Sequence, residues 1–207
     1  MLIERVIREF GYDTPIFAEE ILELFNEFTR AYVFRLIKKA ENAGELVCYS
    51  RGVYYVPRKT FFGVSTICSE QVAEKKYLRD GDSIYGIYSG LSLLNQFGIT
   101  TQVPNILEIV TNNETTRKRK VVIDGKEFIL RKARCEITSE NYPEYSLLQL
   151  FNDIDQQDSL DEFAKGQIGE YIRKNQLTNE RINAMSLFFP AMASKNMLRS
   201  GVLNGAL

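Results

Sequence analysis

The sequence predicts an α+β protein with a small N-terminal domain and a larger mixed α/β domain that ends in helices. Three observations lead to this fold class. Apolar residues recur at helical spacing through residues 1–43. Two short strand-like runs, 46–49 and 53–56, then follow Gly44. Further along, two alternating runs flank Asp124-Gly125, which is a strong signal for a two-residue hairpin turn.

The first 43 residues predict three helices separated by short connections. The first helix covers residues 2–10 and ends at Gly11, where a left-handed conformation costs little. The second covers about 18–25 after a connection that contains Pro15, and the third runs from its cap at Thr29 to about residue 43. Because the strand-like runs come next, the hairpin is expected to pack beside this third helix.

The third helix is expected to have one apolar face and one cationic face. At 100° per residue, the apolar arc contains Val33, Phe34, Leu36, Ile37 and Ala40. The opposite arc carries the polar, cationic and small side chains: Ala31, Tyr32, Arg35, Lys38, Lys39 and Asn42. Long cationic donors, an amide and an aromatic ring are the groups with which a helix reads a DNA groove.

A tight turn, Ser50-Arg51-Gly52, joins the two strand-like runs and places an arginine at the hairpin tip. Two helices, a basic helix and a hairpin with a cationic tip predict a winged helix-turn-helix over residues 1–60, with the domain boundary at Arg58 to Gly63. The alternative is a helical bundle with an unrelated hairpin. On the winged-helix interpretation, the DNA-binding candidates are Arg30, Tyr32, Arg35, Lys38, Lys39, Asn42, Arg51, Arg58 and Lys59.

Charge is sorted along the chain although the formal net charge is only −1. Residues 1–27 hold seven acids and two bases, whereas residues 28–60 hold seven bases and two acids. Residues 117–134 hold eight bases against Asp124 and Glu127. Local basic patches bind a polyanion even when the total charge is near zero, although a single charge run is more often an ordinary solvated surface.

Residues 61–207 predict a mixed α/β domain with C-terminal helices. We expect helices over 69–79, 90–97, 143–152, 160–175 and 179–189, followed by a frayed C-terminus. Strands are expected over 83–88 and 106–110, with hairpin arms at 118–123 and 126–132. The apolar-rich stretch from Met185 to Met197 either packs against this domain or serves a partner, and its pattern does not decide between them.

Composition and spacing argue against an enzyme. The 207 residues include no His, which excludes Ser-His-Asp and Cys-His catalysis and His-ligated zinc. The acidic cluster from Asn152 to Asp158 lacks EF-hand spacing and is more simply a helix boundary, with Asp158 or Ser159 as the cap. No phosphate-binding glycine loop is found. We therefore expect no enzymatic activity, no cofactor and no metal.

The composition also suggests the compartment. Hydrophobic residues make up 44% and charged residues 26%, as in a soluble globular protein. The stretch 83–103 is too polar to span a bilayer, and residues 1–5 do not begin a secretory signal. Three widely spaced cysteines predict reduced thiols. We expect a cytoplasmic protein that does not bind a membrane.

Two segments resemble the AbiEi family of antitoxins from abortive-infection systems. The first, residues 51–57 (RGVYYVP), closes the predicted winged helix, and the second is residues 88–104 (YSGLSLLNQFGITTQVP). The resemblance covers about residues 2–152. It implies a repressor that binds inverted repeats in its own promoter through the winged helix. It also implies a type IV antitoxin, which counters a nucleotidyltransferase toxin through the C-terminal domain without a stable complex.

The resemblance places DNA contacts on Arg35, Lys38, Lys39, Asn42 and Arg51, which the charge pattern also selects. It supplies no short motif for the antitoxin activity. On charge alone, the candidate antitoxin surface is Arg117, Lys118, Arg119, Lys120, Arg131, Lys132 and Arg134. Two other functions remain open: a winged-helix regulator that senses a small ligand in the C-terminal domain, and a nucleotide-handling enzyme with carboxylates that converge on a metal.

Overall fold

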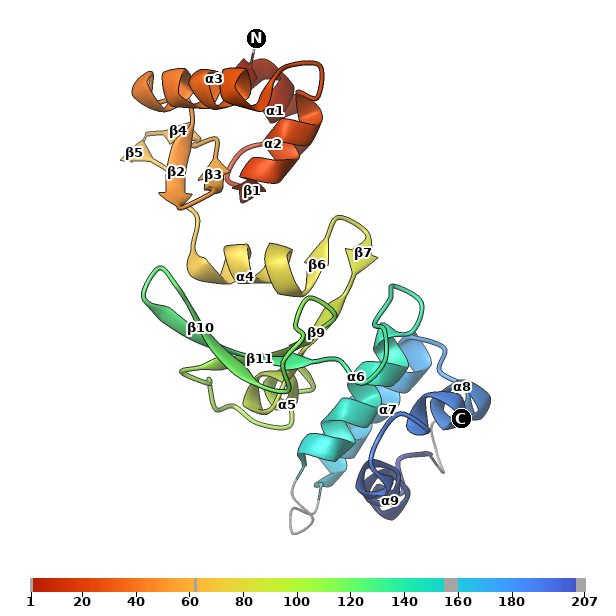
Figure 1. Ribbon diagram of the computed structural model, residues 1–207. Coiled ribbons are helices and arrows are strands. Elements are labelled where there is room, and N and C mark those ends of the chain that lie inside the picture. The colour runs from red at the N-terminus through yellow and green to blue at the C-terminus, as the bar shows by residue number, and fades with distance from the viewer. Residues whose placement is uncertain (1, 62, 155–159, 204–207) are drawn as a thin grey trace. The chain divides into compact units, whose positions relative to one another are not determined.

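A computed structural model describes residues 2–61, 63–154 and 160–203 of the chain, and its α+β class confirms the expected one. The chain divides into two compact units, Met1–Lys75 and Lys76–Leu207 (Figure 1). The division therefore falls after Lys75 and not at Arg58 to Gly63, where the sequence placed it. The added residues belong to the N-terminal unit because the side chains of Ser65 and Gln71 both donate hydrogen bonds to Asp13.

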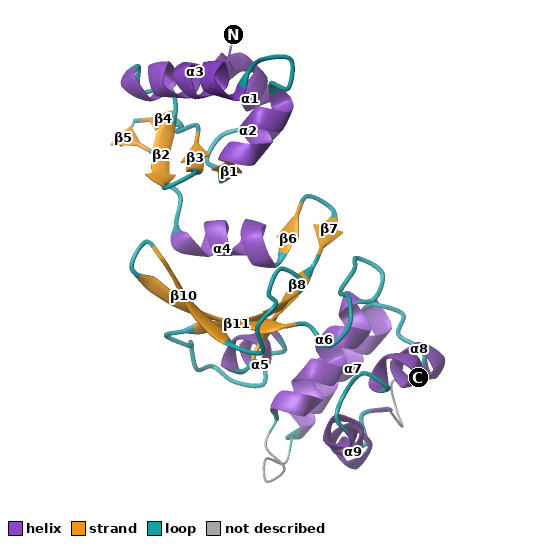
Figure 2. Ribbon diagram, viewed as in Figure 1, coloured by secondary structure: helices purple, strands orange, loops and turns teal. Residues whose placement is uncertain are grey.

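The N-terminal unit combines helices with a small antiparallel sheet (Figure 2). Its sheet has the strand order β1-β3-β2, with Ile16 opposite Tyr54 and Val47 opposite Tyr55. A separate two-stranded hairpin, β4–β5, follows the sheet. The elements are α1 (Leu2–Phe10), β1 (Ile16–Phe17), α2 (Ala18–Leu24), α3 (Arg30–Asn42), β2 (Val47–Ser50), β3 (Val53–Tyr55), β4 (Lys59–Thr60), β5 (Gly63–Val64) and the first residues of α4 (Ser69–Tyr77).

One hydrophobic core holds the N-terminal unit together. It joins the inward faces of the three helices to the sheet through Val6, Ile16, Ile21, Val33 and Ile37, all of which are almost fully buried. The three helices lie where the sequence predicts them. Strand β1 was not predicted, because two residues beside Pro15 carry too little alternation to be told from a loop.

The C-terminal unit is built on a four-stranded sheet of order β10-β11-β9-β8. Strands β9 and β11 run parallel, and the other neighbours run antiparallel. Asp124 and Gly125 both have positive φ, as a two-residue hairpin turn requires, so the predicted β10–β11 hairpin is confirmed. Its elements are β6 (Arg79–Asp80), β7 (Ser83–Ile84), β8 (Gly86–Ser89), α5 (Leu91–Gln96), β9 (Leu107–Thr111), β10 (Arg119–Ile123), β11 (Lys126–Lys132), α6 (Tyr142–Asp153), α7 (Glu162–Lys174), α8 (Asn179–Ser186) and α9 (Ala191–Ser200).

Helix α6 lies at the centre of this unit. Both α5 and α6 pack against β8, and α8 and α9 pack against α6. The predicted core residues of α6, among them Leu147, Leu148 and Phe151, are fully or almost fully buried. Burial on this scale contributes about 1.5–3 kcal/mol per large apolar side chain.

The C-terminus differs from the expectation. Residues 191–200 form α9, so the predicted frayed end is wrong over these residues. The stretch from Met185 to Met197 is split between two environments. Met185, Phe189, Ala193 and Met197 are buried in the core of the C-terminal unit, whereas Leu187 and Phe188 are exposed. Within the described residues, none of the helices has the length and apolar character needed to cross a membrane.

Candidate nucleic-acid interface

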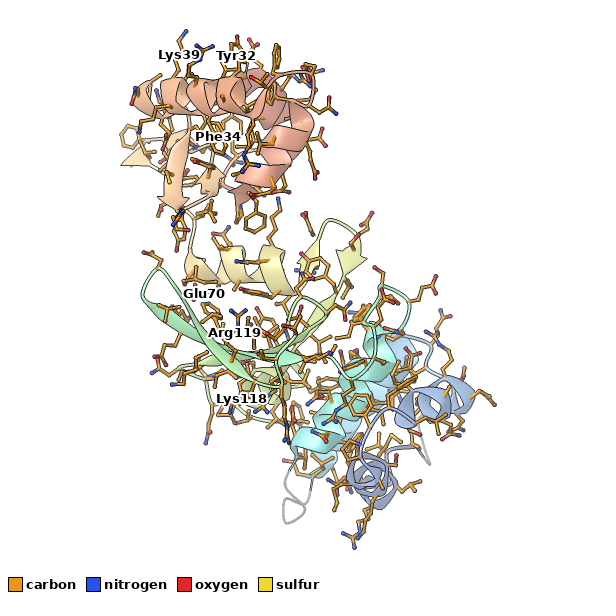
Figure 3. The ribbon with its side chains drawn as sticks, viewed as in Figure 1. Tyr32, Phe34, Lys39, Glu70, Lys118 and Arg119 are labelled. Atoms are coloured by element: carbon orange, nitrogen blue, oxygen red, sulfur yellow. The ribbon has the colours of Figure 1, made fainter. Side chains whose placement is uncertain are left out.

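Helix α3 presents the cationic face that its sequence predicts. Thr29 caps the helix by accepting a hydrogen bond from Tyr32 N at 3.4 Å, and the helix buries Val33, Ile37 and Ala40. In Figure 3, Phe34 points toward the sheet while Tyr32 and Lys39 point away from it. The side chains of the outward arc are exposed, apart from a half-buried Tyr32: Ala31, Arg35, Lys38, Lys39 and Asn42.

Aromatic rings order the arginines in the first turns of α3. The rings of Phe28 and Tyr32 lie 5.0 Å apart, and the guanidinium of Arg35 lies 5.1 Å from the centre of the Tyr32 ring. Arg30 lies 5.4 Å from the ring of Phe34. Such contacts contribute about 0.5–1 kcal/mol at exposed sites, and they restrict an arginine before it meets a ligand.

The two lysines of α3 differ in their surroundings. Lys38 Nζ lies 3.6 Å from Glu41 Oε2 one turn along the helix. An exposed pair of this kind contributes at most about 1 kcal/mol, so a phosphate can displace the glutamate. For Lys39, no ion pair is seen within the described part of the chain.

Arg51 lies apart from α3. It is exposed in the turn between β2 and β3, and Gly52 follows it with φ +78°. The carbonyl of Gly52 accepts a hydrogen bond from Ala18 N at 2.9 Å, which fixes the turn to the start of α2. Strand β2 leads from the end of α3 to this turn, so the turn lies at the end of β2 away from that helix (Figure 1).

Arg58 is held at the base of the β4–β5 hairpin. Its backbone N–H donates to Ser65 Oγ at 2.7 Å, and its Nε lies 3.6 Å from Asp13 Oδ2. The hydroxyl of Ser65 also donates to Asp13, and the guanidinium of Arg58 faces the ring of Tyr12 at 5.7 Å. Lys59 begins β4 and is exposed.

The candidate antitoxin surface of the C-terminal unit is partly neutralised by acids from outside it. Arg131 pairs with Glu108 on the neighbouring strand β9 at 2.8 Å, and Arg119 pairs with Glu114 at 2.8 Å. Lys120 pairs with Glu127 at 3.2 Å. The remaining cations of this surface are Arg117, Lys118, Lys132 and Arg134, of which Arg134 stacks over Phe189 at 5.4 Å.

Glu114 anchors the loop that leads into this hairpin. Its side chain is almost fully buried and accepts hydrogen bonds from Thr115 N, from Thr116 N and Oγ1, and from Arg119 Nε. Burial alone would raise the pKa of this carboxyl, but the hydrogen bonds from Thr116, Arg119 and Thr115 outweigh it and lower the pKa to about 2. The sequence showed Glu114 only as a polar loop residue.

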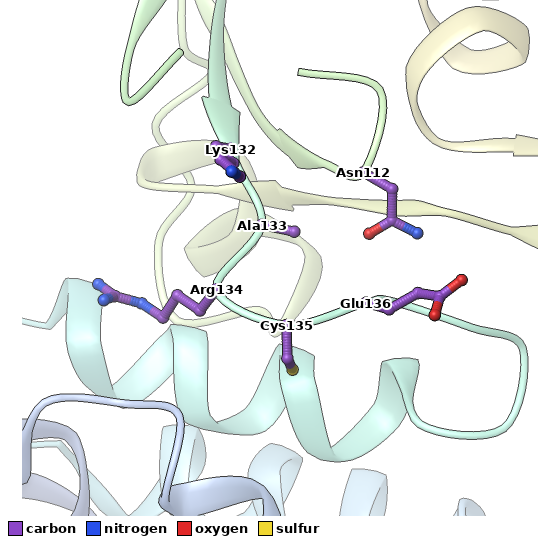
Figure 4. A pocket seen from close by; sticks show the side chains of 6 residues that line it. All are labelled: Asn112, Lys132, Ala133, Arg134, Cys135 and Glu136. Atoms are coloured by element: carbon purple, nitrogen blue, oxygen red, sulfur yellow. The ribbon is translucent and has the colours of Figure 1, made fainter. Parts of the chain in front are cut away.

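Two of the hollows in the described part of the C-terminal unit have linings that combine polar and apolar side chains. One, of about 350 Å³, is formed by Asn112 and residues 132–136. In it, Arg134 and Glu136 point in opposite directions and Cys135 turns toward α6, so its polar groups do not converge on one point (Figure 4). The other, of about 490 Å³, combines apolar side chains with Asp153 and Asp161: its lining is Leu91, Leu94, Ile99, Thr100, Gln102, Asp153, Ile154, Leu160, Asp161 and Ala164.

Both aspartates of the larger hollow are already used by the fold. Asp153 accepts from Gly90 N and Gln149 Nε2 at 2.8 Å each, and Asp161 caps α7 by accepting from Ala164 N at 2.7 Å. The rest of the acidic cluster, residues 155–159, with the proposed caps Asp158 and Ser159, lies outside the described residues. Among those that are described, no three His, Cys, Asp or Glu side chains gather as a metal site would require.

In the comparison with protein-family models, residues 3–180 match a family of unknown function (DUF6088). The chain belongs to the DUF6088 family. The match covers α1 through the start of α8, and so it includes α3, the β2–β3, β4–β5 and β10–β11 hairpins and the larger hollow. A search of curated proteins found no match.

The DUF6088 chain carries features that sequence reasoning missed. The β4–β5 hairpin lies where a boundary was expected, and Phe61 near its tip is 98% exposed. Lys75 is buried, with its Nζ 2.6 Å from Glu20 Oε1 and 2.9 Å from the carbonyl oxygen of Pro15. The sequence held a local sign of the β4–β5 hairpin surface, an aromatic residue shortly after Arg58 and Lys59. It held no sign of the Lys75 contact, because that contact joins residues that are far apart along the chain.

Proposed function

We propose that the N-terminal unit is a winged helix-turn-helix that binds duplex DNA and represses the promoter of its own operon. The observation that carries this proposal is the exposed face of α3, where Arg35, Lys38 and Lys39 lie opposite the buried Val33 and Ile37. The order of elements supports it, since a three-stranded sheet whose last hairpin follows α3 is the arrangement of a winged helix. In this proposal α3 enters the major groove. A contact of Arg51 with the DNA backbone is a separate and weaker part of the proposal, because the turn that carries Arg51 lies at the end of β2 away from α3.

The remaining DNA-binding candidates are expected to contribute to DNA affinity by different amounts. Lys39 and Asn42 extend the α3 face, while Arg30 and Tyr32 lie in its first turn. Arg58 remains a candidate on the same terms as Lys38, because its exposed pair with Asp13 is as long as the pair of Lys38 with Glu41, at 3.6 Å. Lys59 remains a contact from the β4–β5 hairpin.

We further propose that the protein is the antitoxin of a type IV system and counters a nucleotidyltransferase toxin through its C-terminal unit. Support for this part comes from the resemblance of residues 51–57 and 88–104 to the AbiEi family. Within the candidate antitoxin surface, four cations remain exposed and form no ion pair among the described residues: Arg117, Lys118, Lys132 and Arg134, the last of which contacts the ring of Phe189. No stable complex with the toxin is required.

A promoter–reporter assay in cells tests the repressor role. The DNA upstream of the gene drives the reporter, and the chain is supplied in trans as wild type or with Arg35, Lys38 and Lys39 changed to Ala. We expect repression by the wild type and its loss in the variant. A Lys174→Ala variant, which removes an exposed cation from the last turn of α7, controls for the change in charge. Equal repression by all three proteins would contradict the proposal.

The second candidate function is a DNA-binding regulator that senses a small ligand. The hollow of about 490 Å³ favours it, because ligand sites commonly measure about 300–1,000 Å³. Its two aspartates are occupied by backbone and side-chain donors of the fold, which leaves Thr100 and Gln102 as the polar groups to orient a ligand. A metabolite screen that shifts the melting temperature of the wild type but not of a Leu94→Trp variant would support this candidate.

A further inference from the structure

The cationic face of α3 contains an arginine that is held by a stack of two aromatic rings. The ring of Phe28 lies 5.0 Å from the ring of Tyr32, and the guanidinium of Arg35 lies 5.1 Å from the centre of the Tyr32 ring. Phe28 comes just before the cap Thr29, Tyr32 lies in the first turn of the helix, and Arg35 lies about one turn later. The stack therefore connects the start of α3 to Arg35.

The stack fixes the direction of the Arg35 side chain. Because Tyr32 lies closer to the N-terminus of α3, a guanidinium that faces its ring is directed toward that end of the helix. Ala31, which also lies one turn before Arg35, is exposed and has only a methyl group, so it does not cover the guanidinium. In helix-turn-helix proteins, the N-terminal residues of the recognition helix contact base edges. Arg35 is therefore directed toward the part of α3 that meets base pairs in the proposed complex.

The guanidinium of Arg35 keeps its hydrogen-bond donors free. Among the described residues, none forms an ion pair with it or accepts a hydrogen bond from it. Two other arginines of the N-terminal unit also face a ring, but each has an acidic partner as well. Arg5 pairs with Glu27, and Arg58 lies 3.6 Å from Asp13 Oδ2. A ring restricts a guanidinium without using its N–H groups, whereas a carboxylate occupies them.

A restricted guanidinium with free N–H groups suits the recognition of guanine. Arginine donates two hydrogen bonds to O6 and N7 of guanine, and guanine is the base that presents two acceptors in the major groove. A lysine ammonium has no such planar fork. Lys38 and Lys39 lie farther from the N-terminus of α3, and as point charges they suit phosphates.

We propose that Arg35 recognises a guanine in the major groove and that Tyr32 is a positioning residue, whose ring holds the guanidinium toward that base. This inference rests on the proposed DNA-binding function and adds to it the base that α3 distinguishes. Lys38 and Lys39 then supply affinity that does not depend on the base sequence.

A library of single base-pair substitutions in the duplex from upstream of the gene tests the role of Arg35. The full chain is mixed with the library, and sequencing of the bound and free fractions gives the relative affinity for each substitution. For the wild type, we expect a G·C position at which any other base pair lowers the affinity about 10- to 100-fold. Arg35→Lys is expected to abolish this preference with an unchanged salt slope, because the charge is retained. Arg173→Lys makes the same exchange at an exposed position in the last turn of α7 and should keep the preference.

Two substitutions of Tyr32 separate the effect of its ring from that of its hydroxyl. Tyr32→Ala removes the stack and is expected to reduce the guanine preference about two- to fivefold, the size of a cation–π contact at an exposed site. Tyr32→Phe keeps the ring and should keep the preference. Loss of the preference in Tyr32→Phe as well would assign the hydroxyl to a DNA contact and overturn the positioning role.

The outcomes separate the guanine contact from the function on which it rests. A wild-type chain that binds every duplex of the library equally would overturn both. Selective binding in which Arg35→Lys keeps every preference would overturn the guanine contact alone and make Arg35 a phosphate contact. The same holds if the preference lost in Arg35→Lys lies at an A·T position. Loss of the guanine preference in Arg35→Lys, with the full preference kept by Tyr32→Ala, would overturn the role of Tyr32.

Discussion

At the scale of single residues, the basic side chains that the sequence selects fall into paired and unpaired groups. The charge pattern correctly places Arg35, Lys38 and Lys39 on the outer face of α3, because helical spacing fixes the face of each residue. It gave no sign that Arg131 meets Glu108 or that Arg119 meets Glu114. Such pairs depend on strand register between segments that are distant in sequence, and local spacing does not encode register.

The buried Glu114 carboxylate leads to a prediction about stability and pH. Its pKa of about 2 lies below the ordinary value of 4.5, so its stabilising effect is present above pH 4.5 and is lost as the pH falls toward 2. We expect Glu114→Gln to destabilise the C-terminal unit by about 1–3 kcal/mol at pH 7. Urea denaturation at several pH values measures this difference, which should shrink between pH 4.5 and pH 2. A difference that stays constant over this range would contradict the assigned pKa.

At the scale of elements, long periodic helices were predicted well and short strands were not. Helices α1, α2 and α3 lie within about two residues of the expected bounds, because each has a complete apolar stripe and a clear stop such as Gly11 or Gly44. Strands β1, β4 and β5 have two residues each, too few for an alternating pattern. The sequence analysis therefore places a domain boundary around Phe61. It does not predict that Lys59, a DNA-binding candidate, lies in a hairpin.

The exposed lysines of α3 predict a loss of DNA affinity without a loss of folding stability. Removal of Lys39 is expected to lower the slope of log affinity against log salt by about one unit on any duplex, since one phosphate contact is lost. Lys38→Ala should act similarly, because its exposed pair with Glu41 is weak. Neither change should alter the folding stability by more than about 0.5 kcal/mol. Slopes equal to that of Lys174→Ala would mean that α3 does not face DNA.

Helix α6 gives the corresponding prediction for the core of the C-terminal unit. Leu148 is fully buried in the cluster that joins α6 to its neighbours. Leu148→Ala is expected to cost about 2–5 kcal/mol, because it removes buried apolar surface and leaves a cavity. Thermal unfolding by circular dichroism measures the loss. A melting temperature equal to that of the wild type would show that α6 is not central to the core.

At the scale of the whole molecule, the sequence predicts two parts but places their boundary too early. The structure adds residues 61–75 to the N-terminal unit, in which the buried Lys75 forms an ion pair with Glu20 and contacts the rings of Phe10 and Phe17. Ordinary linker signals around residues 58–63 suggested the earlier boundary. A buried charge on α4 is visible only once the chain has folded.

The ion pair of Lys75 with Glu20 predicts that Lys75→Ala destabilises the N-terminal unit by about 1–3 kcal/mol. Glu20 loses its partner but is partly exposed and keeps its hydrogen bond from Phe17 N. The unfolding transition of the C-terminal unit should remain at its wild-type midpoint. Hydrogen exchange monitored by mass spectrometry distinguishes the units peptide by peptide. Loss of protection in both units would show that they do not fold independently.

The central claim is that α3 binds DNA selectively, and fluorescence anisotropy tests it most directly. The full chain is titrated against a labelled duplex from upstream of its own gene and against a scrambled duplex at several salt concentrations. We predict tighter binding to the upstream duplex and loss of that preference when Arg35, Lys38 and Lys39 are changed to Ala. Equal affinity for both duplexes at every salt concentration, unchanged in the variant, would contradict the claim.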